Sequence, residues 1–166
     1  LCEAMHAQGH HVTIAGERGA WSQLFDSEHS PWLDISLKGG YLKLRRATSQ
    51  LVDHLCDHPV DLLHVHYRKA AIVGRWLARR FHLPMLFTLH VTGIPMRGIW
   101  RWLSDFGDHT HAPSKMAQQW LIDVARVDSN RITIIPHGIV ANKFPVADAA
   151  QKLAARRPLG LQANRT

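Results

Sequence analysis

Short apolar runs alternate with longer stretches of helical periodicity along almost the whole chain, and this alternation constrains the fold more than any other feature. The runs at 61–66, 85–89 and 131–135 are apolar, and polar or turn-forming residues follow each of them. The stretches between them place apolar residues three and four positions apart, as amphipathic helices do. Strands that alternate with helices pair in parallel, so the sequence predicts an α/β fold whose parallel sheet carries helices on both faces.

The expected elements follow from this pattern. Strands are expected at 11–15, 33–37, 61–66, 85–89, 109–112 and 131–135, and helices at 41–57, 68–81, 96–106, 115–124 and 147–157. The helix at 41–57 is expected to face inward with Leu42, Leu44, Leu51, Val52 and Leu55. The first residues are typical of the last turn of a helix that Gly9 ends, so further structure is expected before Leu1.

The charge balance favours anionic partners. The chain has 20 Lys and Arg against 13 Asp and Glu, a net charge of +7. Phosphate esters, nucleotide sugars, acidic lipids and nucleic acid fit such a surface, although a solvated basic surface explains the charge equally well. Two cysteines do not make a disulfide framework, so a cytoplasmic location is expected. No apolar run is long enough to span a membrane.

Polar residues gather where the predicted strands end. In open parallel sheets, ligands bind beyond the carboxyl ends of the strands. Those ends carry Gly16, His66, His90, Ser114 and Gly138. The sequence therefore predicts a binding site at this edge of the sheet.

Several short motifs occur in a fixed order. They are Gly9-His10-His11-Val12-Thr13, the run from Asp61 to His66, Leu83-Pro84, Thr88-Leu89-His90, Ala112-Pro113-Ser114, the run from Ile134 to Ile139, and Asn142-Lys143-Phe144-Pro145. Each motif is short, but the ordered set, from about residue 1 to Leu161, resembles the N-terminal domain of glycosyltransferase family 4.

The resemblance implies a GT-B architecture, in which two Rossmann-like domains face each other across a cleft. The N-terminal domain would bind the acceptor, and the C-terminal domain most of the nucleotide-sugar donor. The reaction would retain the anomeric configuration and need no metal or other cofactor. Residues 1–146 would form an incomplete N-terminal Rossmann-like domain, and 147–166 a linker toward a C-terminal donor-binding domain.

The sequence departs from the family pattern at several points. The first strand of the family and its glycine-rich loop are expected before Leu1, and no glutamate follows Glu28, so the paired glutamates of the C-terminal domain are expected beyond Thr166. His137 and Val140 stand where the family usually has Asn and Asp. The chain is therefore expected to be cut at both ends, inactive alone and marginally stable, because a missing central strand exposes sheet edges.

The resemblance also implies roles for individual residues. His90 matches the histidine of the Thr-x-His motif, where it would hydrogen-bond the donor sugar or the developing charge; a histidine bonded to a backbone carbonyl at the edge of the core is the structural alternative. Arg68 opens a helix, where a cation suits phosphate. The residues expected to bind acceptor or donor are His66, Arg68, Thr92, Gly93, Arg97, Ser114 and Gly138, and Ser114 also fits a helix N-cap.

A different chemistry fits the same histidines. His64 and His66 share one face of a strand, and with His90 they form a set that could ligate zinc with an open fourth position. No acidic residue that would orient such ligands is evident nearby. A three-histidine zinc enzyme is therefore one alternative.

Cations and aromatic residues interleave at 97–102. Arg97, Trp100, Arg101 and Trp102 suit an anionic membrane surface, an acceptor head group or stacked bases, unless the indoles simply pack on the sheet. We expect a nucleotide sugar and a sugar or lipid-linked acceptor as partners, with peripheral contact at the inner membrane surface and no nucleic acid. The prediction is the acceptor-binding half of a retaining glycosyltransferase; a non-catalytic Rossmann-like binding module is the second alternative.

Overall fold

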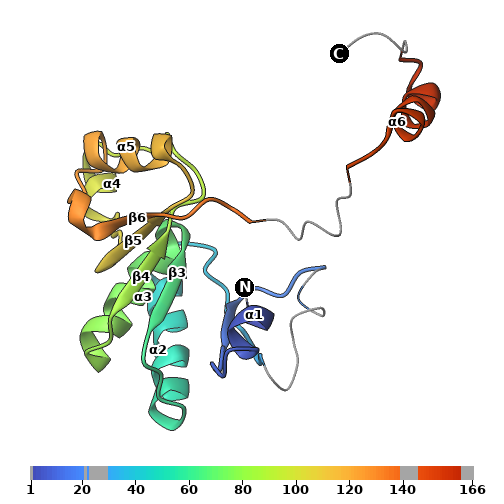
Figure 1. Ribbon diagram of the computed structural model, residues 1–166. Helices are drawn as coiled ribbons and strands as arrows, with labels where there is room; N and C mark the ends of the chain where they lie inside the picture. Colours follow the sequence, from blue (N-terminus) through green and yellow to red (C-terminus); the bar gives the residue numbers. More distant parts are fainter. Residues whose placement is uncertain (1, 21, 23–29, 139–145, 162–166) are drawn as a thin grey trace. The chain divides into compact units, whose positions relative to one another are not determined.

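The computed structural model describes residues 2–20, 22, 30–138 and 146–161 (Figure 1). The chain divides into two units, Leu1–Pro136 and His137–Thr166, and the domain boundary expected after residue 146 stays a prediction. The residues at 139–145, which include the last residue of the motif at 134–139 and the whole motif at 142–145, lie outside the described residues.

A four-stranded parallel sheet forms the centre of the first unit. Its strands are β3 (Leu63–His66), β4 (Met85–Thr88), β5 (His109–Ala112) and β6 (Ile132–Ile134), and they pair in this order. All three pairings are parallel. The predicted α/β class with a parallel sheet is confirmed, and all four expected strands from 61 onward are present.

The register of the strands separates an apolar face from a polar one. Val65 pairs with Phe87, Phe87 with Thr110 and Thr110 with Ile132, and all four are buried. The next residue along each strand points to the opposite face, because side chains alternate along a strand. That second row consists of His66, Thr88, His111 and Thr133.

Helices α3 (Tyr67–Phe81) and α5 (Lys115–Asp123) pack against the apolar face. Their buried residues join the strands in one core cluster, which includes Ala71, Ala78, Ala117 and Leu121. Gly74 lets α3 approach the sheet, since a Cβ there would lie 2.6 Å from Cγ1 of Val65.

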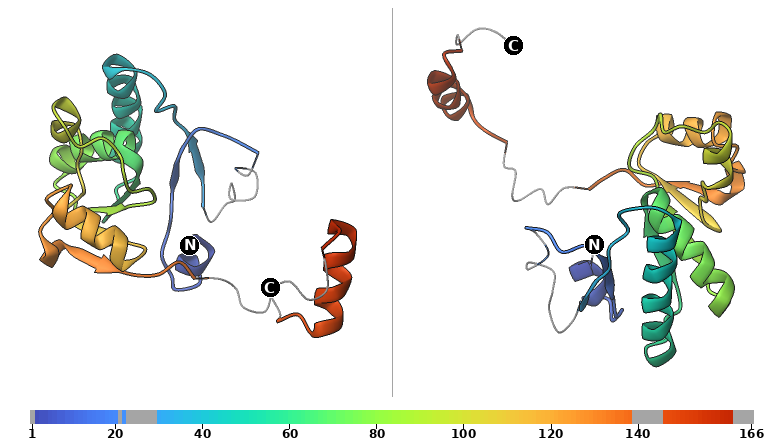
Figure 2. Two further views of the ribbon diagram at one scale, coloured as in Figure 1. Left: turned by 90° about the horizontal axis from the view of Figure 1, so that it is seen from above. Right: turned by 180° about the vertical axis from the view of Figure 1, so that it is seen from behind.

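Helix α2 (Tyr41–Asp57) lies beside α3 in every view (Figures 1 and 2). Its bounds are those expected, and Leu44 and Leu55 are buried against Val73 and Leu77 of α3. The inward orientation predicted for Leu42 is wrong, because that side chain is 81% exposed. Leu42 is two positions from Leu44, about 200° around the helix, and therefore points the other way.

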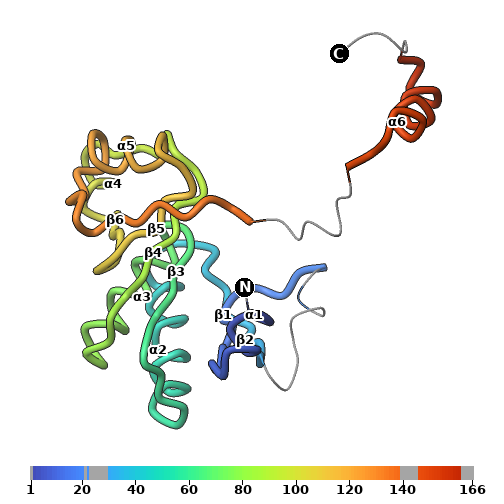
Figure 3. The backbone as a smooth tube through the Cα atoms, viewed as in Figure 1, coloured from blue at the N-terminus to red at the C-terminus, as the bar shows by residue number. Residues whose placement is uncertain are grey.

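A second, two-stranded parallel sheet involves the N-terminal region (Figure 3). Strands β1 (Ile14–Gly16) and β2 (Trp32–Asp34) pair in register, and helix α1 (Cys2–His6) precedes them. The strands expected at 11–15 and 33–37 are present in shorter form. Gly9 has φ +85°, as expected of the residue that ends α1.

The connections after β4 and β5 differ in regularity. The helix expected at 96–106 is reduced to α4 (Ile99–Trp102), which has no buried residue. Helix α5 begins as expected at Ser114, whose hydroxyl accepts a hydrogen bond from the Ala117 amide at 3.1 Å. A 3-10 helix, η2 (Ser129–Arg131), leads into β6.

An arginine at the middle of α3 fixes the turn before β5. Arg75 donates to both carboxylate oxygens of Asp105, at 2.6 and 3.0 Å, and to Asp108 at 3.0 Å. Asp108 in turn accepts from the Met85 amide at 2.8 Å. Burial acts to raise the pKa of Asp108, but the Met85 amide and the Arg75 guanidinium outweigh it and lower the pKa.

The second unit contains helix α6 (Ala149–Arg156) and the 3-10 helix η4 (Arg157–Leu159), neither with a buried residue. Asp148 and Gln151 form a capping box at the start of α6. The solvated helix expected at 147–157 is thus confirmed. None of the helices in the described part of the chain is long and apolar enough to cross a membrane.

Candidate functional site

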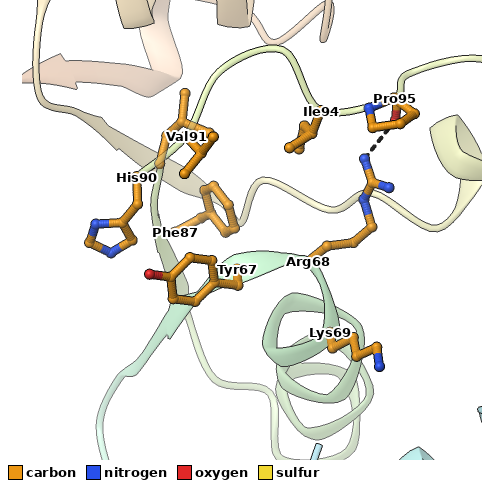
Figure 4. Close-up of a pocket in the computed structure, with 9 residues that line it drawn as sticks. Tyr67, Arg68, Lys69, Phe87, His90, Val91, Ile94 and Pro95 are labelled. Carbon is orange, nitrogen blue, oxygen red and sulfur yellow. Dashed lines mark hydrogen bonds between the residues drawn. The ribbon is translucent and has the colours of Figure 1, made fainter. Parts of the chain in front are cut away.

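A cavity of about 340 Å³ opens at the carboxyl ends of β3 and β4 (Figure 4). The loop after β4 supplies one wall, and the first residues of α3 supply the other. The lining residues are Tyr67, Arg68, Lys69, Phe87, Leu89, His90, Val91, Ile94 and Pro95. The cavity lies at the edge of the sheet where the sequence predicts a binding site.

Two histidines from neighbouring strand ends meet beside this cavity. Nδ1 of His66 lies 2.8 Å from Nε2 of His90, within hydrogen-bond distance. The Tyr67 ring stacks on the His90 ring at a centroid distance of 5.2 Å. Figure 4 shows both side chains next to the cavity. The structure thus brings together His66 and His90, two of the predicted site residues.

Tyr67 has an unusual backbone conformation. Its φ is +68°, in the left-handed region that non-glycine residues rarely adopt. The residue is the first of α3 and directly follows the last residue of β3. The sharp change of direction between strand and helix brings the phenol over His90, so a locally unfavourable conformation is held at a candidate site.

Arg68 is fixed against the opposite wall. One of its NH2 hydrogens is donated to the Pro95 carbonyl at 2.6 Å, and the guanidinium lies 5.2 Å from the centre of the Trp100 ring. Nε is buried and has no hydrogen-bond partner among the described residues. Burial lowers the pKa of Arg68. Lys69 points away from the Tyr67 and His90 rings in Figure 4.

Burial keeps two of the histidines uncharged near neutral pH. The pKa of His66 falls from 6.5 to about 4, first because the ring is withdrawn from water and then because His64, His90 and His111 lie nearby. Burial lowers the pKa of His64 as well, with His111 and His90 as further causes. A neutral His66 can hold His90 by a hydrogen bond without adding charge to the cavity.

A row of hydrogen bonds crosses the polar face of the sheet behind this pair. Nε2 of His111 lies 2.7 Å from the Ile135 carbonyl, so this nitrogen must carry a proton. In a neutral His111 ring, Nδ1 then accepts, and it lies 3.2 Å from the Thr88 hydroxyl. Thr88 therefore donates to His111 and accepts from His64, whose Nε2 lies 2.7 Å away.

The structure does not gather the three histidines of the zinc alternative into a metal site. His64 is bonded to Thr88, whereas His66 is bonded to His90. Across residues 2–20, 22, 30–138 and 146–161, no group of three or more His, Cys, Asp or Glu side chains is arranged to hold a metal ion.

The remaining predicted site residues are spread over several positions. Thr92 and Gly93, which has a positive φ, lie in the loop between the lining residues Val91 and Ile94. Neither is itself a lining residue of the cavity. Arg97 is exposed further along the same loop, and Ser114 caps α5 at the end of β5. Gly138 belongs to the second unit and is described apart from the cavity.

Sequence reasoning missed Tyr67 and most of the apolar wall. Val91, Ile94 and Pro95 look like ordinary loop residues, and their gathering depends on the path of the loop after β4. Tyr67 could have been found from its place directly after His66 at a strand end. Its stacking on His90 depends on a positive φ, which the sequence does not predict for a tyrosine.

The family of the chain is shown by direct comparison. The family model described as Glycosyltransferase Family 4 matches residues 1–143. The chain belongs to this family. None of the curated proteins compared with the chain matches it.

Solved structures share the fold at low sequence identity. A glycosyltransferase from Rickettsia africae ESF-5 superposes with a TM-score of 0.73 and 16% identity, over 98% of this chain and 45% of its own. HepE from Anabaena gives 0.68 and 17%, over 91% and 50%. Sucrose-phosphate synthase from Thermosynechococcus elongatus gives 0.69 and 21%, over 98% and 46%. The chain thus spans about half the length of these proteins, whose likeness shows the fold.

Proposed function

We propose that this chain is the acceptor-binding half of a retaining glycosyltransferase, which transfers a hexose-type unit from a nucleotide sugar to a sugar or lipid-linked acceptor without a metal. The observation that carries the proposal is the cavity at the ends of β3 and β4, with the His66–His90 pair at its edge. Membership in glycosyltransferase family 4 supports the same reaction class. The other half of the site comes from a second domain, so the chain does not catalyse alone.

The donor class has support from a structural neighbour. HepE from Anabaena was solved in complex with UDP and with UDP-glucose. A donor of this kind carries a diphosphate, and the net charge of +7 favours such an anion. Arg68 offers a buried Nε hydrogen that has no partner among the described residues, next to the cavity. We assign Arg68 to binding a phosphate or an acceptor oxygen.

His90 is the proposed catalytic residue. Glycosyl transfer develops positive charge on the sugar while negative charge grows on the leaving diphosphate, and fixed hydrogen bonds stabilise these charges. His66 and the Tyr67 ring hold the His90 ring from two sides. An imidazole held in this way can hydrogen-bond the donor sugar with little loss of side-chain freedom. Thr92 and Gly93, in the adjoining wall, shape the space for the acceptor.

Replacing His90 by alanine in the full gene product tests this role. We expect turnover to fall by about a hundredfold, the usual effect of removing one stabilising group. The assay is release of the nucleoside diphosphate, starting from UDP-glucose and extending to other nucleotide sugars. His109→Ala is the matched control, since this exposed histidine lies on the same face and is bonded to Thr133. Wild-type turnover in the His90 variant contradicts the proposal.

An exposed aromatic surface adjoins the cavity and supports the membrane contact. Ile99 is 68% and Trp102 90% exposed, and Trp100 is half exposed. Arg97 and Arg101 flank them, and no acidic residue occurs between 91 and 103. Indoles beside arginines suit the interface of an anionic membrane. We place the protein in the cytoplasm, with this surface against the inner membrane while the cavity takes a lipid-linked acceptor.

Sedimentation with vesicles tests the membrane contact. The chain is expected to bind vesicles of phosphatidylglycerol and phosphatidylcholine but not of phosphatidylcholine alone, and Trp102→Ser is expected to weaken the binding. Met116→Ser removes an exposed apolar side chain from α5, which lines neither cavity, and is the matched control. Equal binding by the wild type and the Trp102 variant contradicts this contact.

A further inference from the structure

A second cavity of about 310 Å³ lies between α2 and α3, on residues that take no part in the first. Its lining residues are Arg45, Thr48, Ser49, Val52, Trp76 and Arg80. The lining contains no carboxylate. Helix α2 supplies Arg45 and Ser49 one turn apart, and α3 supplies Trp76 and Arg80 one turn apart, so each helix contributes one arginine.

Within the described part of the chain, no carboxylate forms an ion pair with either guanidinium group of this cavity. Arg45 lies over the Trp76 ring at 5.7 Å, and Arg80 over the Phe81 ring at 5.7 Å. The ion pairs found among the described residues involve neither arginine. A guanidinium that stacks on an aromatic ring keeps its hydrogen-bond donors free at its edge, where they match the oxygens of a phosphate.

The floor of the cavity is apolar and ordered. Trp76 is half-buried, and the Tyr41 ring meets it edge-on at a centroid distance of 5.7 Å. Val52 is half-buried beside it. Thr48 is buried, and its hydroxyl is already donated to the Leu44 carbonyl at 2.8 Å. Ser49 is exposed and is the hydroxyl group best placed to meet a ligand.

We propose that this groove between α2 and α3 is a binding site for a phosphate ester with an apolar organic part, distinct from the cavity at the strand ends. Arg45 and Arg80 bind the phosphate oxygens from opposite helices, and Ser49 donates its hydroxyl. The organic part rests against Val52 and Trp76. The volume is at the lower end for small-molecule sites, which fits a single ring or a short chain.

The same chemistry occurs in free organic phosphates and in phospholipid head groups, so the test uses two probes. Phenyl phosphate represents the free ester, and vesicles containing phosphatidic acid represent the lipid. Calorimetric titration of the full chain is expected to show saturable binding of phenyl phosphate, tighter than that of inorganic phosphate. If the ligand is a lipid head group instead, vesicles bind and phenyl phosphate does not.

Matched arginine variants distinguish a specific phosphate-binding site from nonspecific attraction of an anion to the basic surface. Arg45→Gln and Arg80→Gln are each expected to weaken binding of the active probe about tenfold, the effect of losing one charge-assisted hydrogen bond. Arg46→Gln and Arg79→Gln remove the same charge from exposed neighbours on the same helices that do not line the cavity, and they should leave the affinity unchanged. The proposal is overturned if neither probe binds, or if all four variants weaken binding equally.

Discussion

The Nδ1 atom of His66 lies 2.8 Å from the Nε2 atom of His90, which joins the end of β3 to the loop after β4. A hydrogen bond between two imidazole nitrogens needs one nitrogen with a proton and one without. The pair therefore persists only while at least one of the two rings is neutral. Because the pKa of His66 is lowered to about 4, this ring stays neutral across the physiological range.

The stability of the chain should consequently depend on pH. Between about pH 4 and 6.5, the unfolded chain binds a proton at His66 that the folded chain does not bind. The free energy of unfolding therefore rises with pH through this window. It decreases again when the pH is lowered from 6.5 toward 4. His64 acts in the same direction, since its pKa is also lowered. Thermal melts across this window measure the effect.

Substitution of His66 isolates its share of this dependence. His66→Gln should flatten the decline of the melting temperature on acidification. Imidazole signals in NMR titrations provide a direct reading, and a His66 ring that titrates near 6.5 contradicts the structure.

Gly107 should not tolerate a side chain. Its φ is +75°, and a Cβ there would lie 2.5 Å from the Met85 carbonyl oxygen and 2.9 Å from that of His109. Gly107→Ala is expected to lower the free energy of unfolding by about 2 to 4 kcal/mol, from strain and overpacking together. Gly98→Ala, at φ +56° with open space around it, measures strain alone and should cost about 1 kcal/mol. Urea denaturation compares the two variants; equal losses would show that the clash is relieved.

The bidentate contact of Arg75 with Asp105 should require an arginine. Lysine keeps the charge but cannot meet both carboxylate oxygens and Asp108 at once. Arg75→Lys is expected to lower the free energy of unfolding by about 1 to 2 kcal/mol. Arg79→Lys, an exposed position one turn later on α3, should change it by less than about 0.5 kcal/mol. Chemical denaturation of both variants is the measurement, and a silent Arg75→Lys variant would contradict the prediction.

Ser114 should stabilise α5 through its cap. Ser114→Ala is expected to cost about 1 kcal/mol of stability, and Ser114→Asp should restore most of it, because aspartate is an equally good N-cap. The thermal melts of the two variants provide the test. A Ser114→Asp variant as unstable as the alanine variant would argue against capping as the source of the effect.

The sequence predicts the start and end of a helix correctly where a local signal, such as an N-cap residue or a helical periodicity, determines them. Ser114 fixes the start of α5, and the periodicity of α2 gives its bounds at Tyr41 and Asp57. Periodicity alone places Leu42 wrongly, since five apolar residues offered more than one face and only packing against α3 selects among them. The helix expected at 96–106 is reduced to α4, none of whose residues is buried, while Met96 and Phe106 on either side of it join the core.

The site is harder to derive, because its contacts depend on register between strands. The sequence places His66 and His90 at strand ends, but their contact requires β3 and β4 to pair with His66 opposite Thr88. The Thr88–His111 row needs two such registers at once. The apolar wall from Val91 to Pro95 depends on loop geometry, for which no local pattern exists.

The left-handed backbone conformation of Tyr67 brings two requirements into conflict at one position, stability of the chain junction and contact with His90. Glycine would adopt this φ without strain and would make the junction between β3 and α3 easier to form. It would also remove the ring that stacks on His90. A residue that raises the stability of the chain at position 67 is therefore expected to weaken ligand binding at the cavity. A library of variants at this position should separate sequences with a higher melting temperature from sequences that keep their ligand affinity.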